Sequence, residues 1–525
     1  MKTYQRLIAF AILIALLLAA CSATEAPVLT VPEGATAGSL TRLKQCEYQP
    51  ADDDTKYAAE CGTLVVPENW DKTDGRLIAL PVVRIPSRGS NPAEAVFYLQ
   101  GGPGQSNLSW APPNWLLKNH DVVFVGYRGI DGTVTLDCPE VDRLLKTHIG
   151  KDIFSKQAGA ELGLAVKQCA VTHQEAGVDL SGYTIPGVVE DMEAARIALG
   201  YDRINLLSES YGTRVAQIYA TMHPDSLNRL VLIGVNTPGH FVWNPADFDK
   251  MLEHLSELCA QDAACSSRTN DLAETMYNVN RNMPKRWLFF NIDPDTVRLG
   301  THFMLLDNAN MPMIFDMYLA ADEGDPSGLA MLNLITSIVL PLNPQIFGDL
   351  SNKAGTVDLE KYGGIESISL GDSIMGAPMA EFIWPLAKEW PLELIPQNLR
   401  EFQETDVEML LINGTVDFAT PATALDEARP YFHKARMIRL PEFGHIGDVM
   451  TLQPQAFERL VTSYYDTGTA DDSLYVYQPV SFEPGMRLTV IARVLVAAMI
   501  LLPALIILGI VLAVRRIRKR RTIKR

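Results

Sequence analysis

Short apolar runs bounded by turn residues recur along the middle of the chain. They lie at residues 62–66, 77–85, 95–99, 122–125, 204–207, 230–233, 408–412 and 437–440. Their length and their richness in Val, Ile and Leu are typical of buried β-strands. Helix-like stretches separate several of them, such as Val188–Leu199, which Gly200 ends. Strands that alternate with helices predict an α/β fold, in which helices flank a mostly parallel sheet.

Residues 239–400 do not follow this alternation. They are rich in Met, Leu and Pro and have the pattern of a largely helical region. We therefore predict an inserted, mainly helical cap that lies between a first core segment at 45–238 and a second at 401–465. The whole stretch is longer than one hydrophobic core usually takes, which favours such an insertion.

The start of the chain carries an export signal. An apolar run, Leu7–Ala20, follows Lys2 and Arg6 and is too short to cross a bilayer comfortably. Residues 1–21 are therefore predicted to be a signal peptide. The run ends in Leu-Ala-Ala-Cys, which looks like a bacterial lipoprotein cleavage box, so lipidation of Cys21 is predicted. An ordinary signal peptide with a chance cysteine is the alternative. A polar tether at 22–44 follows.

The end of the chain carries a second membrane signal. Val494–Val514 contains no charged residue and is long enough to span a bilayer. We predict a stalk at 466–487, a transmembrane helix at 488–514 and a basic tail at 515–525. Basic flanks stay on the cytoplasmic side. The globular part is therefore predicted to lie on the outer face of a bacterial cytoplasmic membrane, with the tail in the cytoplasm.

The net charge and the spacing of Cys and His residues limit the ligands and partners that we expect. The chain carries a net charge of −17, and its two terminal segments hold basic residues and no acids, so the globular part is more acidic still. Such a surface repels nucleic acid, and no nucleic-acid partner is expected. No Cys or His spacing is typical of a metal site, so we predict no metal and no cofactor.

Six cysteines remain when Cys21 is set aside. An even number in an exported protein suggests disulfides. The six cluster in consecutive pairs along the chain, which favours one connectivity among several: Cys46–Cys61, Cys138–Cys169 and Cys259–Cys265.

The candidate chemistry centres on the pentapeptide Ser208–Gly212. It follows a predicted strand and precedes a helix-like stretch, the context in which a G-x-S-x-G turn presents a serine nucleophile. Ser208 stands at the first glycine of that pattern. Asp417 and His445 follow later predicted strands, in the order Ser, Asp, His that this fold class uses. His445 could take the proton of Ser210, and Asp417 could hold the imidazole in place. Alone, each has a simpler explanation as a turn or surface residue.

A glycine-rich loop supplies a candidate oxyanion site. Gln100–Ser106 follows a predicted strand, and its backbone N–H groups, together with that of Tyr211, could bind a developing oxyanion. The loop lacks the Lys-Ser/Thr ending of a phosphate-binding loop.

Taken together, these motifs resemble the proline iminopeptidase and tripeptidyl aminopeptidase family of α/β-hydrolases. The resemblance covers most of the chain from Cys61 to about Tyr465. It rests on Cys61–Pro67, Gly101–Gly104, Tyr127–Gly129, Tyr183-Thr184, Asp191–Glu193, Ser208–Thr213, His223-Pro224, Asp417 and Gly444-His445.

This resemblance implies the α/β-hydrolase fold and a serine peptidase of aminopeptidase type. Such an enzyme hydrolyses a peptide near its free amino terminus through an acyl-serine intermediate. By matching position, Ser210, Asp417 and His445 form the triad. Gly102 and Tyr211 then donate to the oxyanion. A carboxylate binds the substrate amine in the family, and Glu209 is a candidate for it.

Two departures keep alternatives open. Besides Ser208, Gln100 stands where iminopeptidases often have histidine. Serine carboxypeptidases also carry a Gly-Gly-Pro-Gly loop and a Glu-Ser-Tyr turn. The same triad also serves esterases and lipases that take small acyl substrates, and an inactive hydrolase fold could bind a partner at the membrane.

Overall fold

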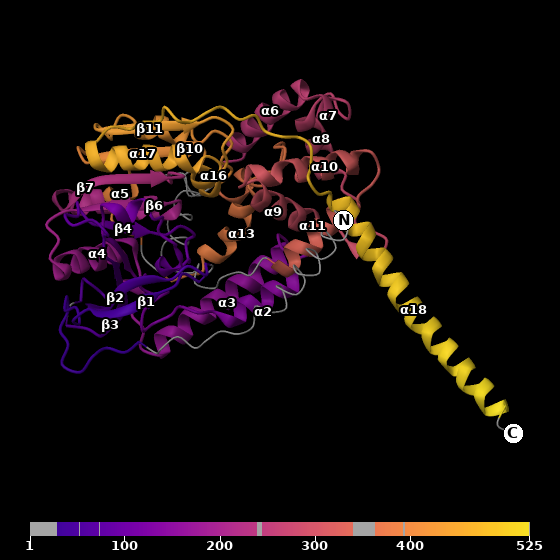
Figure 1. Cartoon of the computed structure of the whole chain (residues 1–525), viewed down its shortest axis with the longest axis horizontal. Helices are drawn as coiled ribbons and strands as arrows, with labels where there is room; N and C mark the ends of the chain where they lie inside the picture. The colour runs from indigo at the N-terminus through magenta and orange to yellow at the C-terminus, as the bar shows by residue number, and fades with distance from the viewer. Residues whose placement is uncertain are drawn as a thin grey trace.

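A nine-stranded sheet forms the centre of the molecule (Figure 1). The computed structural model describes residues 29–51, 53–72, 74–238, 244–339, 363–391 and 394–523. The spatial order of the strands is β1-β2-β3-β5-β4-β6-β7-β10-β11. Their bounds are β1 Lys44–Tyr48, β2 Tyr57–Pro67, β3 Leu77–Ile85, β4 Val96–Leu99, β5 Val122–Val125, β6 Ile204–Glu209, β7 Leu227–Ile233, β10 Glu408–Gly414 and β11 Ala435–Leu440.

The sheet is mostly parallel. Strands β5, β4, β6, β7, β10 and β11 pair in parallel, while β1, β2 and β3 form an antiparallel edge that joins through the β3–β5 pair. All eight predicted strands are present, and β1 is an addition that the apolar pattern did not indicate. The predicted α/β class is confirmed.

Helices cover both faces of this sheet. On one face α4 (Ile185–Leu199) and α5 (Tyr211–Met222) share a core with Val123 and Val125 of β5. On the other face α17 (Pro454–Thr467) shares a core with the alternate residues, Val122 and Phe124. Because successive side chains of a strand point to opposite faces, a strand buried on both sides becomes apolar throughout. The carboxyl edge of the parallel strands is left for the inserted region.

The inserted region between β7 and β10 is mainly helical and has its own core. Phe248, Phe315 and Leu329 are fully buried in it. Its elements are α6 Pro245–Gln261, α7 Ala263–Ser266, α8 Leu272–Arg281, β8 Arg286–Trp287, β9 Phe290–Asn291, α9 Pro294–Met304, α10 Met311–Asp322, α11 Ser327–Val339, α13 Pro378–Ala387 and α14 Gln397–Arg400.

Two helices from the first core segment join this region. Helices α2 (Pro139–His148) and α3 (Lys156–Glu175) lie between β5 and β6 in the chain. Helix α3 packs against α13, with Leu162 and Phe382 in one core, and α2 packs on α3. Figure 1 shows α2, α3 and α13 on the same side of the molecule. The helices over the carboxyl edge of the sheet thus come from two separate stretches of sequence.

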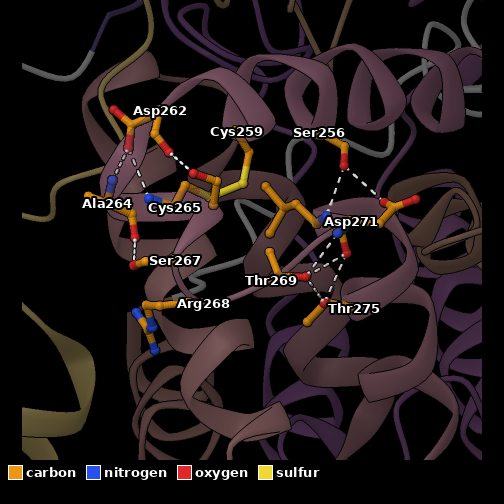
Figure 2. Close-up of a disulfide and its surroundings, with 12 residues drawn as sticks. Ser256, Cys259, Asp262, Ala264, Cys265, Ser267, Arg268, Thr269, Asp271 and Thr275 are labelled. Atoms are coloured by element: carbon orange, nitrogen blue, oxygen red, sulfur yellow. Dashed lines mark hydrogen bonds between the residues drawn. A yellow bond between two sulfur atoms is a disulfide. The ribbon is translucent and has the colours of Figure 1, made fainter.

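Three disulfides close loops in the described structure. They join Cys46 to Cys61, Cys138 to Cys169 and Cys259 to Cys265, the consecutive pairs along the chain. Figure 2 shows the third, at the corner where α6 meets α7. Asp262 caps α7 there by accepting hydrogen bonds from the backbone N–H groups of Ala264 and Cys265, both at 2.9 Å.

Segments near both ends of the chain lie against the domain. Residues 1–28, with the predicted signal peptide and Cys21, lie outside the described residues. Part of the predicted tether pairs with β2, since the Gly38 N–H donates to the Val65 carbonyl at 2.8 Å. In the predicted stalk, Val480 and Phe482 are buried in the core of the inserted region. These segments are therefore folded against the domain.

Helix α18 (Leu488–Ile523) follows the domain in the chain and extends away from it (Figure 1). The segment 488–516 is long and apolar enough to cross a membrane, and an 18-residue window within it has a mean hydropathy of 3.0. The first turns pack on α10 and α11, and Leu488 and Ala492 are buried there. Beyond them the helix projects away from the domain.

Candidate active site

Ser210 occupies a sharp turn between strand and helix. Strand β6 ends at Glu209 and α5 begins at Tyr211, so Ser210 alone makes the turn, with φ 48° and ψ −119°. A positive φ costs a non-glycine residue about 1–3 kcal/mol, and neighbouring contacts must hold it. Here the Ser210 N–H donates to the Ile233 carbonyl at 2.8 Å, and the Thr213 hydroxyl donates to the Ser210 carbonyl at 2.6 Å. Ser210 is partly exposed while both its neighbours are buried.

Small residues around the turn allow this geometry. A Cβ at Gly212 would lie 2.2 Å from the Leu99 carbonyl oxygen, so only glycine fits there. Ser208, at the first glycine of the usual pattern, is fully buried, and its hydroxyl donates to the Val231 carbonyl at 3.3 Å. The serine fits within the sheet because its hydroxyl has a partner on the neighbouring strand. The departure from the motif does not disturb the turn.

Asp417 and His445 form a buried hydrogen-bonded pair. His445 Nδ1 lies 2.8 Å from Asp417 Oδ2. Asp417 is fully buried, and its Oδ1 accepts hydrogen bonds from the N–H groups of Ala419 and Thr420, both at 2.8 Å. The Thr420 hydroxyl donates to Oδ2 at 2.7 Å. These bonds fix the carboxylate, so it can orient the imidazole. Thr420 was not among the residues predicted from the sequence, although its place three residues after an aspartate is a common turn signal.

The imidazole of His445 lies beside the end of β7. Gly234 has a φ of 61°, and a Cβ there would lie 2.9 Å from His445 Cε1. Ile233, the preceding residue, accepts the Ser210 N–H, so the serine turn and the imidazole meet at this point. The backbone N–H of His445 donates to the Leu306 carbonyl of the inserted region at 2.7 Å. Gly234 was not among the residues predicted from the sequence, although a glycine directly after a buried strand often marks a place where another group approaches the backbone closely.

Two opposing effects set the pKa of His445. Burial lowers the pKa, and the charge and hydrogen bond of Asp417 raise it, with smaller contributions from Glu209 and Asp307. The net pKa is raised above that of a free imidazole. The pair therefore stabilises an imidazolium, the species that a general base forms when it takes a proton.

The glycine loop is held against the serine turn. A Cβ at Gly101 would lie 3.0 Å from Ser210 Cβ. Gly102 has a φ of 109°, and the Gly102–Pro103 peptide is cis. Asn107, which the sequence analysis missed, anchors the loop: its Oδ1 accepts the Gln100 N–H at 2.7 Å, and its Nδ2 donates to the Val125 carbonyl at 2.9 Å. Backbone amides of this loop therefore lie next to Ser210.

Glu209 lies beneath the turn. Its side chain is almost fully buried, and its Oε1 has no hydrogen-bond partner among the described residues. Burial raises the pKa of Glu209 to about 7, although Tyr98 and His445 oppose this shift. A buried carboxylate without full hydrogen bonding is costly when ionised, and this cost is the physical cause of the raised pKa.

Arg128 and Asp191, which belong to the motifs that resemble the aminopeptidase family, have a structural role. The Arg128 guanidinium is buried and donates to both oxygens of Asp191, at 2.7 and 2.5 Å. It also donates to the carbonyls of Glu68 and Gly182. Arg128 thus ties the end of β5 to α4 and to the loop after β2.

One group of possible metal ligands occurs among the described residues, made of Cys138, Cys169 and His173. The two cysteines are joined in a disulfide, so their sulfurs are not thiolate ligands. This group does not make a metal site.

Comparisons with known proteins agree with this geometry. Residues 94–295 match the family model described as alpha/beta hydrolase fold, and residues 379–474 match the model described as TAP-like protein. A tripeptidyl aminopeptidase of Streptomyces lividans is 23% identical over 80% of this chain and 84% of its own length. One from Streptomyces coelicolor is 28% identical over 80% of this chain and 83% of its own length. Serine protease Hip1 of Mycobacterium tuberculosis is 26% identical over 39% of this chain and 42% of its own length.

The chain belongs to the serine peptidases of the α/β-hydrolase family, and it is a serine hydrolase of peptidase type.

Proposed function

We propose that this chain is an exported, membrane-anchored aminopeptidase that cleaves peptides near a free amino terminus through an acyl intermediate on Ser210. The observation that carries the proposal is the buried Asp417–His445 pair beside a partly exposed serine on a strained strand-to-helix turn. The tripeptidyl aminopeptidases that align over 80% of this chain support the substrate class.

In the proposed reaction, His445 Nε2 takes the hydroxyl proton of Ser210 while Oγ attacks the peptide carbonyl carbon. Asp417 holds Nδ1–H and so leaves Nε2 able to accept the proton. The N–H groups of Gly102 and Tyr211 stabilise the oxyanion. The imidazolium then gives its proton to the departing amine, and a water molecule, activated by the same imidazole, hydrolyses the acyl-serine ester.

Glu209 is the proposed ligand of the substrate ammonium. It adjoins the nucleophile, and its Oε1 is without a hydrogen-bond partner among the described residues. Since burial raises the pKa of Glu209 to about 7, ionisation and therefore binding of the ammonium group increase as the pH rises through that value.

The location is also part of the proposal. We place the catalytic domain on the outer face of a bacterial cytoplasmic membrane, with α18 across it, the basic tail in the cytoplasm and lipidated Cys21 as a second anchor. Three disulfides support an oxidising compartment, and the Arg- and Lys-rich residues 515–525 support the orientation.

A fluorophosphonate probe on the full chain in detergent micelles tests the proposal. The wild type and Ser208→Ala should be labelled, whereas Ser210→Ala should not. Ser208 is the matched control because it is a serine only two residues before Ser210, in strand β6, and is buried. Probe-free wild type from the same preparation is then offered free and N-acetylated peptides and short-chain esters. Release from free peptides alone supports the aminopeptidase. Equal rates on acetylated peptides, or turnover of esters alone, contradict it, and unlabelled folded protein indicates an inactive binding protein.

A further inference from the structure

The turn between β8 and β9 exposes two large apolar side chains. Trp287 and Phe290 pair across this short hairpin, so Leu288 and Phe289 form its two-residue turn. Leu288 is 62% exposed and Phe289 57% exposed. Trp287 and Phe290 stack at 5.9 Å and pack partly buried against the core of the inserted region. The base of the hairpin is therefore fixed, and its tip faces outward.

The backbone at this tip is strained. Leu288 has a φ of 52°, whereas two-residue hairpin turns favour glycine or asparagine where φ is positive. A leucine at such a position usually needs compensation from packing, yet this side chain is mostly exposed within the chain. An apolar tip held outward in a strained turn points to a contact outside the chain.

The hairpin lies close to the place where α18 leaves the domain. Both of its strands contact α11, and α11 contacts α18. Trp287 and Phe290 border the same core as Ile491 and Leu495 from the first turns of α18. Figure 1 shows α18 departing beside α11. Arg493 is the last charged residue before the apolar stretch, so the membrane surface lies near this level.

The charges next to the tip suit a lipid surface. Lys285 and Arg286 directly precede Trp287 at the base of the hairpin, are exposed, and form no ion pair with a described residue. The chain as a whole carries −17, so these two exposed cations oppose its overall charge. Aromatic and apolar side chains flanked by Lys and Arg are typical of segments that lie in the headgroup region of anionic membranes.

We propose that Lys285–Phe290 is an additional membrane contact beside α18, in which Leu288 and Phe289 insert into the outer leaflet while Lys285 and Arg286 pair with anionic headgroups. The proposal rests on α18 crossing the membrane, as proposed above, and does not depend on peptidase activity. A single helix leaves the domain free to tilt. A second contact beside it fixes how the domain faces the bilayer.

Nitroxide labels on the full chain in lipid nanodiscs test this contact. The label is placed at Phe289→Cys and, as control, at Leu164→Cys on α3, which is 69% exposed; both carry Cys21→Ala. In phosphatidylglycerol-containing discs, the ratio of oxygen accessibility to nickel-chelate accessibility should be several-fold higher at position 289 than at 164. Equal ratios overturn the proposal, as does a label shielded from both reagents, which indicates a protein contact.

A charge variant and two further readouts test headgroup pairing, anchoring by α18 and peptidase activity separately. Lys285→Gln with Arg286→Gln should lower the ratio at position 289 in phosphatidylglycerol discs and leave it unchanged in phosphatidylcholine discs. An equal effect in both lipids overturns the headgroup pairing. Chain that does not enter discs refutes the anchoring by α18. Peptidase activity, measured on the same samples, reports separately on the proposed function.

Discussion

Replacing Glu209 by glutamine should stabilise the protein at alkaline pH. The folded state raises the pKa of this carboxyl from 4.5 to about 7, because burial disfavours the ionised form. The folded state therefore holds the proton more tightly than the unfolded state does. Its stability is highest below about pH 4.5 and falls as the pH rises toward 7. At about 1.4 kcal/mol per pKa unit, the ionised carboxylate costs roughly 3 kcal/mol above pH 7.

Unfolding of the full chain in detergent, followed from pH 4 to pH 9, measures this cost. Glu209→Gln resembles the protonated form, so it should match wild type near pH 4 and exceed its stability by roughly 3 kcal/mol near pH 8. Glu47→Gln is the control, since the Glu47 side chain is 60% exposed. Destabilisation by Glu209→Gln at pH 8 would contradict this cost of the ionised carboxylate, because it would mean that the carboxylate has strong partners in the folded state.

The same substitution tests the proposed role of Glu209 in binding. With peptides that have a free amino terminus, KM should rise in Glu209→Gln above pH 7, while kcat changes less. With N-acetylated peptides the variant and the wild type should have similar KM values. An unchanged KM for free peptides contradicts amine binding by Glu209 and leaves the stability prediction standing.

Other predictions concern the triad and the disulfides. Asp417→Asn should lower kcat by about 10⁴-fold, because the wrong tautomer of His445 is favoured; steady-state kinetics on a peptide substrate measure it. Gly234→Ala should lower kcat by about 10²-fold with the fold retained by circular dichroism, since its Cβ displaces the imidazole. Because the pKa of His445 is raised, kcat/KM should increase with pH through a midpoint above about 6.5, and a midpoint at or below it would contradict the cited causes. Removal of Cys138–Cys169, which closes a 31-residue separation, should cost roughly 3–4 kcal/mol in denaturant unfolding.

Much of the fold was predictable because its signals are local. The apolar runs of the inner parallel strands are buried on both faces, so they stand out from the turn residues around them, whereas β11 at the edge is only partly buried. The chain order of Ser210, Asp417 and His445, each after a predicted strand, also follows from short windows of sequence. Strand β1 was missed because Lys44–Tyr48 lies at the sheet edge and is mostly polar. An edge strand buries little, and so it lacks the apolar pattern.

Contacts between distant segments were not predictable in this way. The bond of Asn107 to the Val125 carbonyl, the room that Gly234 leaves for His445 and the burial of Glu209 each depend on segments far apart in the chain. The elements, their order and the residue types at the strand ends could be read from short windows of the chain, because hydrophobic period and turn chemistry act over a few residues. Which side chains meet there, and where the Leu288–Phe289 tip lies, depends on the folded molecule, because packing and burial sum over the whole fold.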